Sequence, residues 1–274
     1  MTPHTSRAHS DLRQRVLSAV VIAPAVLGAV WLGGIAFLLM VAIAVILMAY
    51  EWSRVTCAES WRVDMGVLSL TVLVSIAAVV APNSLPVQGV IVTVVMLGAA
   101  VASLIGVVVL RPQPWRVIGI PYLVVGVSAI VWLRMQDGGL GLTLWLLASI
   151  WAMDIGAYFA GRTIGGPKLA PRASPNKTWS GLLGGMLAAG LVGAGASFLI
   201  DDAPIPAMIV VSAALGGWSQ VGDIAESAVK RHFGVKDMSN LIPGHGGILD
   251  RVDGLLFAAP MMAMAVAWLL PAWR

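Results

Sequence analysis

The chain has 274 residues, of which 59% are hydrophobic and only 11% carry a charge, whereas soluble domains average about 45–50% and about 25%. Together with a mean hydropathy of +0.90, this composition excludes a soluble globular protein and predicts an all-α, polytopic transmembrane helical protein. The net charge of +4 is expected to reflect basic cytoplasmic loops, so we expect no nucleic-acid partner. Because Cys57 is the single cysteine, the chain forms no intrachain disulfide.

Apolar stretches of about 20 residues, bounded by Pro, Gly or charged residues, predict about nine membrane-spanning helices. In chain order they are 16–32, 34–50, 65–81, 87–110, 117–133, 139–160, 181–200, 205–224 and 254–271. Residues 16–150 are rich in Val, Leu and Ala, and their charged residues lie mainly in loops. The candidate catalytic and binding residues lie further along the chain. We therefore expect one membrane domain, 1–274, in which 16–150 are scaffold spans and 151–274 hold the catalytic spans and cytoplasmic loops.

The distribution of basic residues predicts the orientation of these spans. If the N-terminus is cytoplasmic, 15 of the 17 Lys and Arg residues fall on the cytoplasmic side, and Arg134 and Arg274 fall outside. Basic residues are enriched in cytoplasmic loops of membrane proteins. We therefore expect a multi-pass protein of the cell (inner or plasma) membrane, with the polar loops near the C-terminus facing the cytoplasm.

Asp154 lies within the apolar sequence SIWAMDIGAYFAGR, toward the predicted cytoplasmic end of its span. A carboxylate is costly at membrane depth, so such a residue is by default a functional candidate. The alternative is an acid that is ion-paired with Arg162 or with another loop cation.

A basic, turn-rich segment follows at residues 161–181, GRTIGGPKLAPRASPNKTWSG. It combines Lys168 and Lys177 with small hydroxyl side chains at Ser174 and Thr178. Cationic side chains and free backbone N–H groups ahead of a helix suit phosphate binding. A basic cytoplasmic loop can equally reflect topology or attract anionic lipid, and composition leaves both interpretations open. The sequence contains neither GxxxxGKS nor GxxxxGKT, so a P-loop NTPase is not expected.

The densest group of ionisable residues spans the end of one predicted helix and the start of the next. Four polar residues at positions i, i+4, i+7 and i+8 lie on one helix face. They are Asp223, Ser227, Lys230 and Arg231. Asp250 and Asp253, at i and i+3, share a face of the following helix, which is entered through the flexible sequence GHGG.

Carboxylates on two helices, facing Lys and Arg across a glycine-rich turn, suit a metal ion and a polyphosphate. Asp223 and Asp250 are the best candidate metal ligands, because hard oxygen ligands suit Mg²⁺. His245 lies between glycines, where it contacts phosphate or orders the turn; both interpretations remain open. His and Cys residues are too few near one another for a zinc site.

The order of these residues resembles the phosphatidate cytidylyltransferases, also called CDP-diacylglycerol synthases. One block is Ser227-x-x-Lys230-Arg231, then Lys236-Asp237, then His245-Gly246-Gly247-x-x-Asp250-Arg251-x-Asp253. The second block runs from Asp154 to Ser174-Pro175-Asn176-Lys177-Thr178. At Ser180 the chain departs from the family, in which Glu is more often expected before the Gly, so no acidic role is carried over to that position.

The resemblance implies an enzyme that converts CTP and phosphatidic acid to CDP-diacylglycerol and pyrophosphate, for phospholipid biosynthesis. It implies dependence on Mg²⁺, with room for K⁺ beside it, contact with membrane lipids, and a homodimer. The residues expected to act in catalysis are Asp223, Ser227, Lys230, Arg231 and Asp250, of which Asp223 and Asp250 hold the metal. Those expected to bind substrate are Asp154, Lys168, Ser174, Lys177, Thr178, His245, Arg251 and Asp253.

Four other functions compete with this hypothesis. A CTP-dependent polyprenol or phytol kinase, or a cytidylyltransferase for another lipid phosphate, would differ in its phosphate product or its lipid. A transporter would use Asp154 and Asp223 as an ion pathway, but it predicts paired broken helices in two similar halves, whereas the polar residues here gather in one half. A purely structural membrane protein would leave the carboxylates at the helix ends unexplained.

Overall fold

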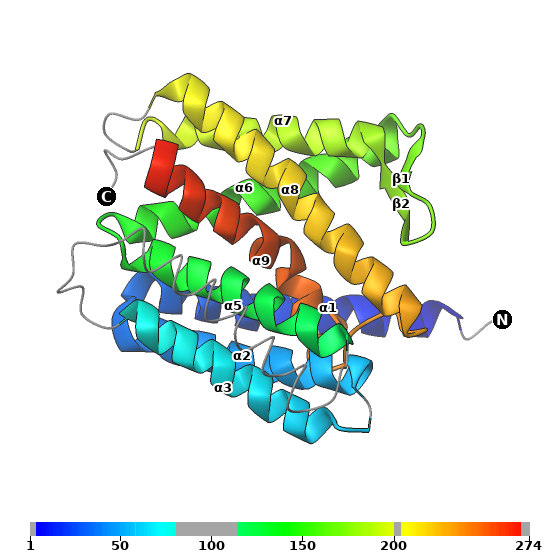
Figure 1. Ribbon diagram of the computed structural model, residues 1–274. Coiled ribbons are helices and arrows are strands. Elements are labelled where there is room, and N and C mark those ends of the chain that lie inside the picture. Colours follow the sequence, from blue (N-terminus) through cyan, green and yellow to red (C-terminus); the bar gives the residue numbers. More distant parts are fainter. Residues whose placement is uncertain (1–3, 58, 81–113, 200–203, 270–274) are drawn as a thin grey trace.

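The computed structural model describes residues 4–57, 59–80, 114–199 and 204–269, which form a bundle of long helices with one small hairpin (Figure 1). The helices are α1 (His4–Leu32), α2 (Gly34–Thr56), α3 (Trp61–Val80), α5 (Pro114–Met135), α6 (Gly139–Thr163), α7 (Trp179–Ala196), α8 (Ile205–His232) and α9 (Leu249–Met264). A short π-helix, Ala265–Leu269, continues α9. Strands β1 (Lys168–Ala170) and β2 (Ser174–Thr178) pair antiparallel between α6 and α7.

Seven helices among the described residues are long and apolar enough to cross a membrane. They are Gly34–Thr56, Trp61–Val80, Val117–Met135, Gly139–Thr163, Trp179–Ala196, Ile205–His232 and Leu249–Trp268. A helix satisfies its backbone hydrogen bonds internally, as a segment in lipid must. The chain is therefore a polytopic helical membrane protein, and the predicted fold class is confirmed.

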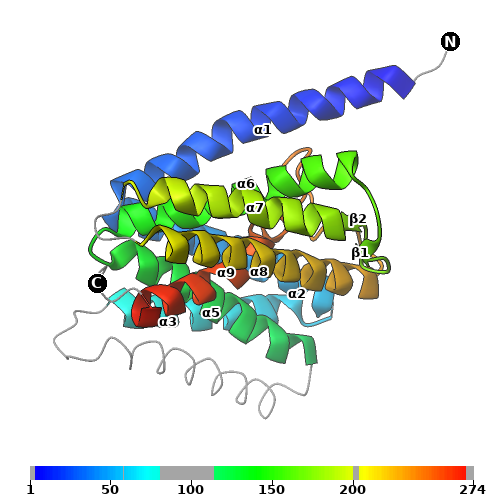
Figure 2. The same ribbon diagram turned by 90° about the horizontal axis from the view of Figure 1, so that it is seen from above.

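The count of nine spans stays a prediction. The expected first span, 16–32, lies within α1, whose apolar part, Val20–Leu32, is shorter than a full span. The expected span 87–110 falls outside the described residues. Figure 2 shows that α1 crosses one side of the bundle and that its N-terminal part projects beyond the other helices.

Two helix boundaries differ from the predicted spans in a way that matters for the site. α8 continues to His232 rather than ending at 224, and α9 begins at Leu249 rather than at 254. Hydropathy locates the point at which an apolar stretch gives way to charged residues. A helix continues past that point for as long as its i to i−4 backbone hydrogen bonds are formed. The polar face of α8 is therefore one continuous helical face, and Asp250 lies in the first turn of α9.

α9 lies at the centre of the bundle, where it packs against α2, α5, α6 and α8. Small residues permit similarly close packing of α6, α7 and α8: a Cβ atom at Gly185 of α7 would lie 2.5 Å from Met153 Sδ of α6. Further along α7, a Cβ atom at Gly193 would lie 2.3 Å from the Met208 carbonyl oxygen of α8. Because lipid offers no hydrophobic driving force between helices, such close contact is what holds them together.

Candidate active site

The hairpin, the C-terminal end of α8 and the N-terminal end of α9 bring the predicted site residues to one end of the bundle (Figure 1). Thr178, the last residue of β2, is the N-cap of α7, and its Oγ1 accepts the Gly181 N–H at 3.1 Å. This bond satisfies one of the otherwise unpaired N–H groups of the first helical turn. It also fixes the direction in which the hairpin leaves α7.

Lys177, next to that cap, reaches from the hairpin to α8. Its Nζ donates to Asp223 Oδ2 at 2.6 Å, and the two side chains are 22% and 25% exposed. We call this ion pair the hairpin pair. Both partners keep access to the solvent side of the site, so either can meet a bound ligand.

Asp154 of α6 belongs to the same cluster. Its Oδ1 accepts a hydrogen bond from Gln220 Nε2 at 3.1 Å, and its carboxylate interacts electrostatically with Asp223, Lys177 and Arg251. Arg162, the loop cation named as its alternative partner, instead donates to the Tyr158 hydroxyl at 2.8 Å. The cations that act on Asp154 are thus those of the candidate site itself.

A third carboxylate, Asp253, faces α8 from α9 and interacts electrostatically with Asp223 and Glu226. The helices approach closely here because Gly254 has no side chain: a Cβ atom would lie 3.2 Å from Asp223 Oδ1. The acidic side chains of Asp223 and Glu226 on α8 and of Asp253 on α9 therefore gather at the contact between these helices. Such a concentration of negative charge suits a bound cation.

Lys230 forms a second, more deeply placed ion pair. Its Nζ donates to Asp250 Oδ1 at 2.7 Å and to Glu226 Oε1 at 3.2 Å. The Lys230 and Asp250 side chains are 11% and 3% exposed, and we call them the buried pair. The other oxygen of Glu226, Oε2, is buried and has no hydrogen-bond partner among the described residues.

Asp250 also closes the loop that precedes α9. Its Oδ2 accepts the N–H groups of Met238 at 2.9 Å and Gly247 at 2.7 Å. With both lone pairs of Oδ2 in use, only Oδ1, beside Lys230, retains capacity for a metal ion. Within the described ranges, no three Asp, Glu, His or Cys side chains converge closely enough to form a metal site by themselves.

The remaining predicted residues lie on the hairpin, on α8 and α9, and in the loop between these two helices. Arg231 is exposed and its Nη1 donates to the Val235 carbonyl at 3.2 Å, which tethers the end of α8. Lys168 and Arg251 are exposed cations, and Ser174 and Ser227 are half-buried. His245 Nδ1 is buried, and no hydrogen-bond partner for it lies in the described part of the chain.

The sequence of the whole chain matches a known family. Residues 13–269 match the model of the cytidylyltransferase family. The chain belongs to this family. It is 36% identical over 266 residues to a phosphatidate cytidylyltransferase of Brucella suis, an alignment that covers 92% of both chains. It is 33% identical over 270 residues to one of Pseudomonas aeruginosa, covering 94% of this chain and 97% of the relative.

A phosphatidate cytidylyltransferase of Haemophilus influenzae is 45% identical over 130 residues, about half of each chain. The predicted resemblance is thus confirmed, and it extends well beyond the two motif blocks on which it rested. The protein is an enzyme of the nucleotidyltransferase class.

The cytidylyltransferase has two site residues that sequence reasoning missed. Gln220 lies three residues before Asp223, and its side-chain amide donates a hydrogen bond to Asp154. Glu51, fully buried at the end of α2, accepts hydrogen bonds from the loop before α9. An acidic residue at the edge of an apolar stretch was the available signal for Glu51, but its partners are nearly 200 positions away along the chain.

Ser180, where the family resemblance led us to expect Glu, has a local role in this cytidylyltransferase. Its Oγ donates to the Gly165 carbonyl oxygen and lies 3.1 Å from Thr178 Oγ1. It therefore ties the turn before β1 to the start of α7 and supports the hairpin that presents Lys177.

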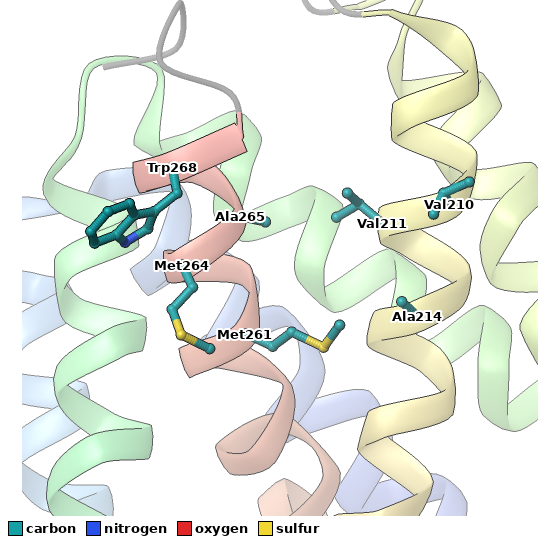
Figure 3. A pocket seen from close by; sticks show the side chains of 7 residues that line it. All are labelled: Val210, Val211, Ala214, Met261, Met264, Ala265 and Trp268. Atoms are coloured by element: carbon teal, nitrogen blue, oxygen red, sulfur yellow. The ribbon is translucent and has the colours of Figure 1, made fainter.

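An apolar cavity of about 570 Å³ lies between the N-terminal half of α8 and the C-terminal end of α9 (Figure 3). The polar cluster lies at the opposite ends of these two helices. It is lined by Val210, Val211, Ala214, Met261, Met264, Ala265 and Trp268. None of these side chains is ionisable, so the cavity supplies no group for phosphate chemistry.

Proposed function

We propose that this cytidylyltransferase transfers the cytidylyl group of CTP to phosphatidic acid, giving CDP-diacylglycerol and pyrophosphate. Support comes from its relatives in Brucella suis and Pseudomonas aeruginosa, which are phosphatidate cytidylyltransferases and align over more than nine tenths of this chain. The structural observation that carries the proposal is the convergence of Asp154, Lys177 and Asp223 from three separate elements.

The reaction requires little proton transfer. A phosphate monoester has a second pKa of about 6, so the attacking phosphatidate oxygen is already largely ionised at neutral pH. That oxygen forms a bond to the α-phosphorus of CTP, and the bond from the α-phosphorus to the oxygen that bridges to the β-phosphate breaks. Pyrophosphate leaves with that oxygen. Catalysis therefore depends on orientation and on offsetting negative charge rather than on a general base.

The side chains divide between these two tasks. Lys177 is partly exposed and pairs with Asp223, so it can exchange that carboxylate for a phosphate oxygen. Arg231, in the last turn of α8, and Arg251, near the start of α9, are exposed cations. They offset the charge of the triphosphate. Lys230 stays within the buried pair and orients Asp250.

The expected Mg²⁺ fits the acidic contact between α8 and α9. Asp223 would hold it, with Asp250 Oδ1 as the second predicted ligand and with the carboxyl group of Asp253 close to Asp223. Because the protein offers few ligands, the remaining positions would be filled by phosphate oxygens and water, as is usual for Mg²⁺. When bound, Mg²⁺ would neutralise charge on the phosphates and align the reacting oxygens, and K⁺ is proposed to bind beside it.

The proposal places this end of the bundle in the cytoplasm and the protein in the inner membrane. CTP is water-soluble and phosphatidate lies in the membrane, so the site must meet both at the headgroup level. The basic hairpin and the basic end of α8 lie at the same end, as the positive-inside rule requires. A homodimer is proposed from the family resemblance alone.

The test uses the purified protein, vesicles that contain phosphatidic acid, Mg²⁺, and CTP labelled in its cytosine ring. We expect a lipid-extractable cytidine product, with one pyrophosphate released for each product molecule and neither formed without phosphatidic acid. Absence of a labelled lipid would overturn the proposal. Release of CDP in place of pyrophosphate would indicate a lipid kinase.

A further inference from the structure

Glu51 connects the scaffold half of the chain to the loop that carries the predicted motif. It lies on α2, is fully buried, and both of its carboxylate oxygens accept hydrogen bonds. Oε1 accepts from the Ile248 N–H at 2.8 Å and from the Ser239 hydroxyl at 2.6 Å. Oε2 accepts from the Leu249 N–H at 2.8 Å.

These bonds cap α9 from another helix. The first N–H groups of a helix have no partner within it, and a Ser, Thr, Asp or Asn side chain at the N-cap usually supplies one. The N-cap residue of α9 is Ile248, whose side chain cannot do so. Glu51 supplies the acceptor instead, and its negative charge also complements the positive end of the helix dipole.

Glu51 and Asp250 together close the loop between α8 and α9. In the first part of the loop, Asp250 accepts a hydrogen bond from the Met238 N–H, and Glu51 accepts one from the Ser239 hydroxyl. At the end of the loop, Asp250 accepts a hydrogen bond from the Gly247 N–H, and Glu51 accepts bonds from the N–H groups of Ile248 and Leu249. The two carboxylates thus bind neighbouring residues at both ends of the same loop.

The paired glycines before α9 follow from this arrangement. A Cβ atom at Gly247 would lie 2.6 Å from Glu51 Oε1, and one at Gly246 would lie 2.9 Å from Asp250 Oδ2. Gly246 also has a φ of +83°, a conformation that side chains disfavour. Each glycine lets one carboxylate approach the backbone, so the glycine-rich sequence reflects the two carboxylates as well as any ligand.

We propose that Glu51 is a positioning residue for the reaction: it fixes the start and rotation of α9, and so sets where Asp250 and Asp253 face α8. The assignment rests on the proposed function for its catalytic consequence. A carboxylate that orients ligand-bearing residues from outside the site commonly affects activity by about 10- to 100-fold when it is changed.

The experiment compares the full-length wild type with Glu51→Gln and Glu51→Ala in the lipid-product assay and by hydrogen–deuterium exchange without substrate. Gln keeps one acceptor oxygen and Ala keeps none. We expect kcat to fall in that order, by about 10- to 100-fold for Ala, with no matching rise in KM for CTP. Backbone amide exchange in the Glu51 variants should be faster than in the wild type at residues 238–249 and unchanged in α7.

Two control variants separate positioning from folding. Glu59→Gln makes the same change at an exposed position shortly after α2 and should leave both measurements unchanged. Val45→Ala opens space at a fully buried position of α2 and should lower thermal stability while keeping kcat. If Glu51→Gln does not yield folded protein, Ser239→Ala removes one of the same bonds, and we expect a smaller loss of kcat with faster exchange near residue 239.

Wild-type kcat and wild-type exchange in Glu51→Gln would overturn the proposal. So would a loss of kcat that tracks thermal stability in Val45→Ala and the Glu51 variants alike, with exchange quickened throughout the protein. If the wild type makes no cytidine lipid, the proposed function falls, whereas the exchange measurement still tests the contact between Glu51 and α9.

Discussion

The hairpin pair and the buried pair join the same two residue types, Lys and Asp, yet their surroundings give them different roles. Lys177 and Asp223 are 22% and 25% exposed and come from a hairpin and a helix. Lys230 and Asp250 are 11% and 3% exposed; Lys230 also donates to Glu226, and Asp250 also accepts from the loop backbone. A partly exposed pair is worth about 0–1 kcal/mol, so the hairpin pair can open for a ligand at little cost.

Breaking the buried pair is far more costly, because it leaves an uncompensated charge inside the protein. Under the proposed function, we expect the hairpin pair to meet the substrate and the buried pair to hold the site together. We therefore do not expect all of the motif residues to bind phosphate. Variants of the two pairs test this distinction.

Removal of divalent metal should have the largest effect on activity. Chelation by EDTA is expected to abolish formation of the cytidine lipid, because the phosphate charges would then lack a counterion, and added Mg²⁺ should restore it. The thermal unfolding of the substrate-free protein should change little, since both ion pairs join side chains of the protein itself. Full activity in EDTA would contradict the metal proposal.

Lys230→Met should have the largest effect on stability. It leaves Asp250 and Glu226 buried without their cation, and the loss of one partner of a buried pair costs about 3–5 kcal/mol. Thermal unfolding in detergent measures the change. The double variant Lys230→Met/Asp250→Asn should lose less than the sum of the two single variants, whereas strict additivity would show that the pair is not coupled.

Asp223→Asn should affect activity and leave the fold intact. We expect a loss of about 10²- to 10³-fold in kcat, the size typical of removing one group that stabilises transition-state charge. The free energy of unfolding should change by less than about 1 kcal/mol, because the hairpin pair is partly exposed. Asp137→Asn, the same change at an exposed position between α5 and α6, is the matched control; equal activity of the two variants would refute the role of Asp223.

Lys177→Met should give the smallest effect. Loss of a cation that reaches the triphosphate is expected to raise KM for CTP by about tenfold, equivalent to about 1.4 kcal/mol. Arg172→Met removes an exposed cation from the turn of the same hairpin and should leave KM unchanged. A similar rise in KM for both variants would show a general charge effect in place of a specific contact.

Much of the site could be predicted from sequence where its parts are local. The spacing of Asp223 and Lys230 predicted one helical face, and α8 confirms it because the helix continues through the charged residues. The spacing of Asp250 and Asp253 likewise placed both on the next helix, as α9 shows. Helical periodicity depends only on neighbouring positions, so it can be read without knowing the fold.

The partners of these residues could not be predicted in the same way. Lys177 and Asp223 lie 46 positions apart, and Glu51 and Leu249 lie 198 positions apart, so each contact depends on how the helices pack. The cap of α9 was missed because its N-cap residue, Ile248, gives no sequence signal. Lys230 was expected to act in catalysis, but the sequence could not show that its ammonium group donates to both Glu226 and Asp250.

The transfer of the cytidylyl group is tested most directly by following the two ends of the triphosphate. Purified protein in phosphatidic acid vesicles would be supplied with CTP labelled at either the α- or the γ-phosphorus. Cytidylyl transfer predicts that the α label appears in the lipid and the γ label in pyrophosphate, with both products reduced in Asp223→Asn. Label from the γ-phosphorus in the lipid, or no labelled lipid at all, would contradict it.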